Sequence, residues 1–166
     1  MVMVKIKFNK YRLNEVINNF IENLEDLEYS ISKYDKIDKN DEMELRLVSK
    51  SIRASSLSIY KVSEDYLGMS LKKVGIGVSD MAFKSCVNLA FSKGLLTKEI
   101  KDYLIENVDI RNIDAHTYNQ PSIEDLISMF IANRDLLYRY LEFLKGLYKS
   151  GFEKKDLFKE SSIFNK

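Results

Sequence analysis

The feature that most constrains the fold of this chain is a helical period of apolar residues over three long stretches. Apolar side chains recur at helical spacing over residues 13–34, 45–66 and 123–144. Residues that recur in this way share one face of an α-helix, so each stretch is predicted to bury that face against the others. The helix boundaries predicted from the pattern are residues 10–35, 41–67 and 122–148.

Glycine and polar residues predict where the elements between these helices begin and end. Gly68 is expected to end the second helix, and the GIG sequence at residues 75–77 to form a loop. Ser79 is a candidate N-cap for a shorter helix that Gly94 closes. The small residues at 51–58 indicate close approach of another helix; the alternative is that Arg53 lines a dimer cleft.

Further signals complete the predicted architecture. Thr97 is expected to begin a helix that carries Val108 toward residue 111, and Pro121 to end that segment. Ser122 with Asp125 resembles a capping box for the last helix, and the alternation of residues 1–8 predicts a short strand or extended arm. The chain is therefore expected to be all-α, an up-and-down four-helix bundle with an additional short helix and a short N-terminal arm.

Length and charge bound the organisation and the partners. The 166 residues, 45% of them apolar, predict one domain over residues 1–166, with a core at about 11–148 and a C-terminal tail at 149–166. We expect the apolar side chains of the tail to pack back on the bundle; docking on a partner is the alternative. The 26 basic and 25 acidic residues give a net charge of +1, so any RNA contact must come from a local patch.

Cysteine and histidine are too few for a zinc site. Cys86 is the single cysteine and His116 the single histidine, so neither a disulfide nor a Cys/His metal cluster can form within the chain, and no metal or cofactor is expected. The opening residues lack the apolar run of a signal peptide, and no later stretch approaches the length needed to cross a membrane, so neither is expected. These features predict a cytoplasmic protein without a membrane partner.

The most informative motif is RNIDAHTYN, which begins at Arg111 and contains the single histidine. On an ideal helix, with about 100° between residues, Arg111 and Tyr118 lie on nearly one line, while His116 shares a row with Asn112 and Asn119. Rows this polar are expected to face solvent. The reach of an arginine would then place an anion site beside an acid/base.

The chemistry of this pair fits RNA cleavage without a metal. An imidazole with a pKa of ~6.5 transfers protons at neutral pH, and a guanidinium holds phosphate oxygens through paired donors. A symmetric dimer would bring two histidines into one cleft. The ordinary alternative is that His116 caps or decorates a surface helix, that Arg111 pairs with Asp114, and that Tyr118 covers the bundle with its hydroxyl in water.

The motif resembles the R-N-x-x-(A/S)-H-T-Y-(N/D) signature of the HEPN superfamily, in particular its branch of nucleotidyltransferase substrate-binding proteins. In that branch the signature precedes the last long helix of a four-helix bundle, the position that it has here. The resemblance covers about residues 11–148. It implies a homodimer whose two R-x-x-x-x-H motifs line a cleft.

The resemblance also implies a function. The implied protein is the HEPN toxin of a toxin–antitoxin pair and a metal-independent endoribonuclease. Its antitoxin would be a minimal nucleotidyltransferase of the MNT type, which silences the toxin by AMPylation. Arg111 would hold the scissile phosphate, His116 would be the general acid/base, Asn112 would orient the site and Tyr118 would receive AMP. The alternative is a non-catalytic substrate- or nucleotide-binding subunit of a minimal nucleotidyltransferase. A plain helical adaptor is a third reading.

Overall fold

The chain forms a helical bundle. In this computed structural model, the described residues are 5–6, 8–111, 113, 120–150 and 152–153. Within them lie three long helices, two short helices, a 3₁₀ turn (η1) and a pair of two-residue strands, and the prediction of an all-α bundle is confirmed. Their bounds are β1 Lys5–Ile6, α1 Lys10–Lys36, α2 Glu42–Lys73, α3 Phe83–Ser92, α4 Lys98–Glu106, η1 Val108–Arg111, α6 Ile123–Ser150 and β2 Phe152–Glu153.

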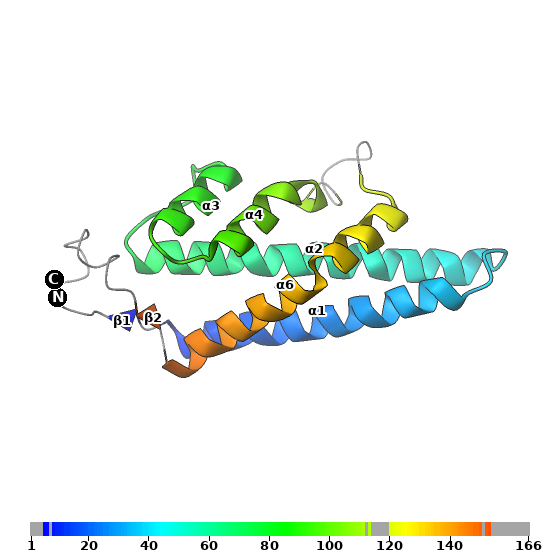
Figure 1. Cartoon of the computed structure of the whole chain (residues 1–166), viewed down its shortest axis with the longest axis horizontal. Coiled ribbons are helices and arrows are strands. Elements are labelled where there is room, and N and C mark those ends of the chain that lie inside the picture. The colour runs from blue at the N-terminus through cyan, green and yellow to red at the C-terminus, as the bar shows by residue number, and fades with distance from the viewer. Residues whose placement is uncertain (1–4, 7, 112, 114–119, 151, 154–166) are drawn as a thin grey trace.

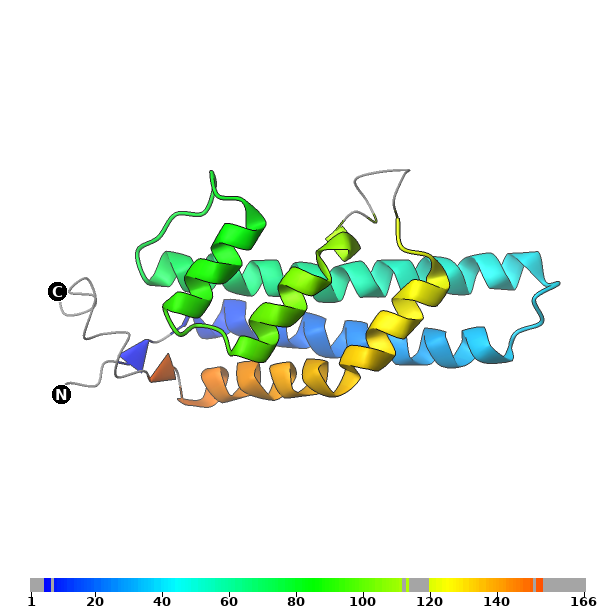
Figure 2. The same ribbon diagram turned by 45° about the horizontal axis from the view of Figure 1, so that its top comes forward.

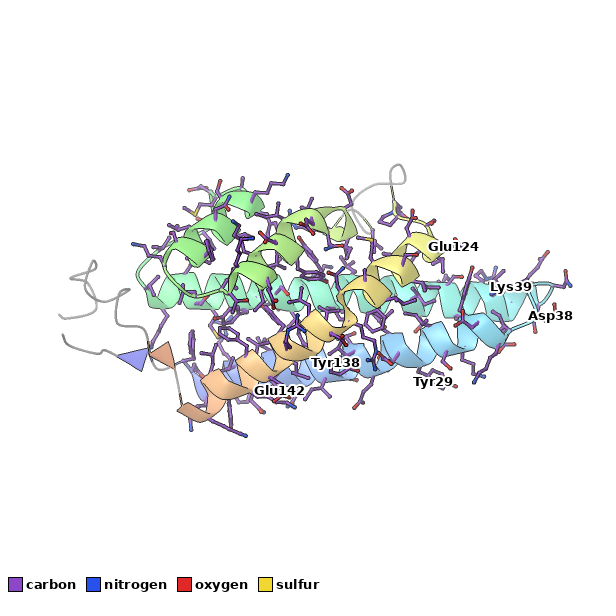
Figure 3. The ribbon with its side chains drawn as sticks, in the orientation of Figure 1. Tyr29, Asp38, Lys39, Glu124, Tyr138 and Glu142 are labelled. Carbon is purple, nitrogen blue, oxygen red and sulfur yellow. The ribbon has the colours of Figure 1, made fainter. Side chains whose placement is uncertain are left out.

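Helix α2 lies between the other elements. It runs antiparallel to α1 as one long hairpin, with α3 and α4 on its other side and α6 crossing the hairpin obliquely (Figures 1 and 2). The tip of the hairpin, marked by Asp38 and Lys39 in Figure 3, is at the opposite end of the molecule from β1 and β2. None of the described helices is both long and apolar enough to cross a membrane.

Small side chains bring α1 and α2 close together. Ser55 and Ser56 of α2 are buried, and the hydroxyls of Ser51 and Ser30 share a hydrogen bond of 2.6 Å between the two helices. A serine occupies little volume, and the bond between Ser30 and Ser51 shows that the two helices lie close together at this point. This contact agrees with the close helix approach predicted for residues 51–58.

The predicted end of the second helix at Gly68 is wrong, because α2 continues to Lys73. A glycine inside a helix costs about 1 kcal/mol relative to alanine, whereas burying a leucine side chain contributes about 1.5–3 kcal/mol. The helical turn after Gly68 buries Leu71 completely, so burial outweighs the propensity of the glycine. The chain leaves the helix at Gly75, whose φ of 83° suits a residue without a side chain.

The start of α3 also differs from the prediction. Ser79 is not its N-cap; the helix begins at Phe83, and Ala82 at the N-cap position makes no side-chain hydrogen bond. Residues 78–81 instead form a turn, closed by a hydrogen bond of 3.0 Å from the Met81 amide to the Val78 carbonyl. The later start places the Phe83 ring 5.5 Å from the buried ring of Tyr60.

Three other helix-end predictions are confirmed. Gly94 follows α3 with a φ of 74°, and the Thr97 hydroxyl accepts a hydrogen bond from the Ile100 amide at the start of α4. Before α6, the Asp125 amide donates to the Ser122 hydroxyl at 3.0 Å and the Ser122 amide donates to the Asp125 carboxylate at 3.3 Å. The capping box therefore fixes where the chain enters α6.

The two ends of the described chain meet in a short antiparallel ladder. Lys5 pairs with Glu153 and Ile6 with Phe152, so the extended arm is present as β1 and the start of the tail returns to it as β2. The remaining apolar tail positions, including Leu157 and Phe164, lie outside the described residues, and their packing stays a prediction.

Buried tyrosine hydroxyls join α2 to α4 and to the loop between α3 and α4. The Tyr60 hydroxyl donates to the Leu104 carbonyl in α4, and the Tyr66 hydroxyl donates to the Leu95 carbonyl at 2.7 Å. Both rings are completely buried, and this burial raises the pKa of both phenols. The two bonds satisfy polar groups that would otherwise be buried without partners.

We predict that Tyr60→Phe destabilises the fold by about 1–3 kcal/mol, because it leaves the buried Leu104 carbonyl without its donor. The matched control is Tyr11→Phe, which removes the hydroxyl of a tyrosine that is 73% exposed and should change stability by less than about 0.5 kcal/mol. Urea unfolding measures both. Equal effects of the two substitutions would contradict this role for the Tyr60 hydroxyl.

Candidate functional site

Arg111 lies at the end of the 3₁₀ turn η1, which follows α4. The expectation that the α4 helix carries Val108 is wrong, because α4 ends at Glu106 and Val108 begins η1. The change of backbone geometry follows Asn107, a buried residue whose side-chain amide donates to the Tyr103 carbonyl at 2.9 Å. The turn buries Ile110 while Arg111 stays at the surface.

Two contacts hold the Arg111 guanidinium. Its Nε lies 2.5 Å from Oε1 of Glu64 in α2, and its central carbon lies 4.5 Å from the centroid of the Phe83 ring in α3. The Arg111 side chain is 41% exposed and that of Glu64 is 32% exposed. A planar guanidinium against an aromatic face is a favourable cation–π arrangement, so the arginine is oriented while part of it remains open to solvent.

The other end of the motif segment is attached to the same helix. Nη1 of Arg53 in α2 donates to the Pro121 carbonyl at 2.8 Å, and the Gln120 side-chain amide donates to the Ile113 carbonyl at 2.9 Å. Ile113 is itself buried. The segment is thus attached to α2 at both ends, and the described contact of Arg53 is internal to the chain.

The other predicted site residues cannot be placed relative to Arg111. Asn112, His116 and Tyr118 lie outside the described residues, and so does the predicted alignment of Arg111 with Tyr118. Arg111 itself has 3₁₀ geometry and not the α-helical geometry on which that alignment rests.

Two hollows adjoin described residues at the ends of the motif segment. One, of about 160 Å³, has Arg111, Glu64 and Phe83 in its wall. The other, of about 500 Å³, is lined by Gln120, Pro121 and residues of α6 and carries the carboxylates of Asp109 and Asp125. Two carboxylates disfavour the approach of an anion, so the hollow beside Arg111 is the better suited of the two to a negatively charged group.

Sequence reasoning did not find Glu64 and Phe83 as members of this site. Glu64 is one of many charged residues on a long helix. Phe83 begins a helix for which the sequence predicts an earlier start, at Ser79. The contact between Glu64 and Arg111 spans 47 positions, and no local spacing in the sequence marks it.

Within the described residues, no group of three or more histidine, cysteine, aspartate or glutamate side chains could hold a metal ion. Comparison of the chain with protein-family models, with curated proteins and with solved structures finds no match. The features of this chain that bear on function are therefore its motif and the geometry around Arg111.

We predict that Arg53→Ala lowers the free energy of unfolding by about 1 kcal/mol, because it removes the part-buried hydrogen bond to the Pro121 carbonyl. Lys50→Ala, at an exposed position of the same helix, is the control and should stay within about 0.5 kcal/mol of the native protein. Chemical unfolding compares the two variants. If Arg53→Ala is no more destabilised than Lys50→Ala, this bond does not anchor the segment.

Proposed function

We propose that this chain is the HEPN-type toxin of a toxin–antitoxin pair and acts as a metal-independent endoribonuclease. The observation that carries the proposal is the setting of Arg111, which starts the RNIDAHTYN motif and is presented at the surface on Phe83 by its ion pair with Glu64. An arginine oriented in this way beside a hollow is suited to hold a phosphate.

In the proposed mechanism, Arg111 binds the scissile phosphate and stabilises the charge that builds on it, and Asn112 orients the site. As a general base, the imidazole of His116 accepts the proton of the 2′-hydroxyl. As a general acid, it donates a proton to the leaving 5′-oxygen. One histidine serves one proton transfer at a time, so we propose a homodimer in which two motifs face one cleft.

Glu64 has a defined part in this scheme. Its ion pair with Arg111 is made through Nε, whereas paired contacts of a guanidinium with phosphate also use the terminal nitrogens. A partly exposed ion pair is worth no more than about 1 kcal/mol. A phosphate can therefore compete with Glu64 without disturbing the helices.

We predict that the purified protein cleaves RNA in the presence of EDTA, and that Arg111→Ala and His116→Ala each reduce the rate by about 10²-fold or more, as expected for loss of a charge-stabilising group or a general acid/base. Cleavage of labelled RNA under single-turnover conditions measures the rates.

Arg134→Ala is a matched control. Arg134 also forms an ion pair with a glutamate of another helix, Glu28, and its guanidinium lies 5.1 Å from the ring of Tyr138, which Figure 3 labels. Its removal should leave cleavage unchanged. If the native protein leaves RNA intact and binds a nucleotidyltransferase tightly, the alternative of a non-catalytic binding subunit is favoured. The net charge of +1 agrees better with this alternative.

We predict that the partner, an MNT-type nucleotidyltransferase, silences the protein by adding AMP to Tyr118. The added phosphate and nucleoside would compete for the Arg111 site by charge and bulk while the helices stay folded. After co-expression, peptide mapping should find AMP on Tyr118, and Tyr118→Phe should resist silencing with unchanged helicity. An adduct at another residue with the same silencing would contradict the switch.

A further inference from the structure

The hollow beside Arg111 has the composition of a small-molecule subsite. Its walls come from α2, from the loop between α2 and α3, and from the first turn of α3, elements that lie side by side in Figure 2. Its lining is mixed: Leu67, Val78 and Met81 are apolar, and Glu64 and Arg111 supply an acceptor and a donor. Binding sites combine apolar walls with a few placed polar groups in this way.

The volume and the chemistry limit what this hollow can hold. About 160 Å³ is well below the 300 Å³ or more typical of drug-sized ligand pockets, and corresponds to one small ring system. The guanidinium carbon of Arg111 already lies over the Phe83 ring, 4.5 Å from its centroid. Unpaired bases of RNA pack on aromatic rings and on guanidinium planes.

We propose that this hollow is a nucleobase subsite that receives an unpaired base next to the phosphate held by Arg111, and that Glu64 favours guanine there. The carboxylate of Glu64 accepts hydrogen bonds only, and guanine offers two adjacent N–H donors on its pairing edge. The inference rests on the proposed function in taking RNA as the source of the base. Base binding itself can be measured without any cleavage.

Cys86 provides the measurement. It is the only cysteine of the chain, lines the hollow, and is 8% exposed; burial raises the pKa of its thiol. A ligand in the hollow must shield this thiol from a small alkylating reagent. The rate of iodoacetamide addition, followed by intact mass, therefore reports whether the hollow is occupied.

The experiment compares GMP, UMP and a short RNA that contains one guanine. By mass action, a ligand at ten times its half-saturating concentration should slow Cys86 alkylation about ten-fold. We expect GMP to protect at lower concentration than UMP, and the RNA at lower concentration than GMP, because its additional phosphates reach Arg111. Glu64→Gln should remove the difference between GMP and UMP, whereas the control Arg134→Ala should retain it.

Substitutions at Gly68 offer a second test, because a side chain at this position would enter the hollow. A Cβ added at Gly68, which lines the hollow, meets no atom within 4 Å. Gly68→Ala should therefore retain protection by GMP, whereas Gly68→Leu should lose it. Circular dichroism checks that both variants are folded.

The outcomes separate this inference from the proposed function. Protection by GMP without RNA cleavage would support the subsite and overturn the ribonuclease. Cleavage of RNA without protection of Cys86 by any nucleotide would support the ribonuclease and overturn the subsite. Equal protection by GMP and UMP that survives Glu64→Gln would overturn the role of Glu64, and equal protection by GMP and the RNA would overturn RNA as the source of the base.

Discussion

Burial of helix α2 on two sides is the constraint on which the rest of the structure depends. One side packs on α1, where Ser51 bonds Ser30, and another uses the Tyr60 hydroxyl to hold α4. Packed from both sides, α2 continues as one helix from Glu42 to Lys73. Its surface contributes Arg53 and Glu64, the two side chains to which the ends of the motif segment are attached. The stability of the core and the placement of the candidate site thus have a common origin.

The sequence predicted much of the fold because helical periodicity and capping residues are local signals. The three long helices, the glycine after α3 and the capping box before α6 follow from residues close together in the chain. The failures at the end of α2 and at the start of α3 have a non-local cause. Helix α2 passes Gly68 because Leu71 is buried by other elements, and α3 begins at Phe83, where its ring meets Tyr60. A residue's neighbours in sequence do not report such contacts.

Only part of the candidate site could be predicted, because its contacts join residues that are far apart in the sequence. The motif singled out Arg111 by its own sequence, and the structure places this arginine at the surface beside a hollow. Its partners Glu64 and Phe83 come from two other helices and carry no motif. The expectation of a continuous α-helix to the motif failed at Asn107, where the change to a 3₁₀ turn buries Ile110. The roles of Asn112, His116 and Tyr118 stay predictions from the sequence.

In the mechanism that we propose, Arg111 and His116 cleave RNA by activating its own 2′-hydroxyl. The most direct measurement is mass spectrometry of the product ends after cleavage in EDTA, with a matched substrate that carries 2′-deoxyribose at the cut site. Attack by the 2′-oxygen predicts a 2′,3′-cyclic phosphate and a 5′-hydroxyl, and an intact deoxy-substituted substrate. Products with a 5′-phosphate and a 3′-hydroxyl, or cleavage at the deoxy position, would contradict the mechanism.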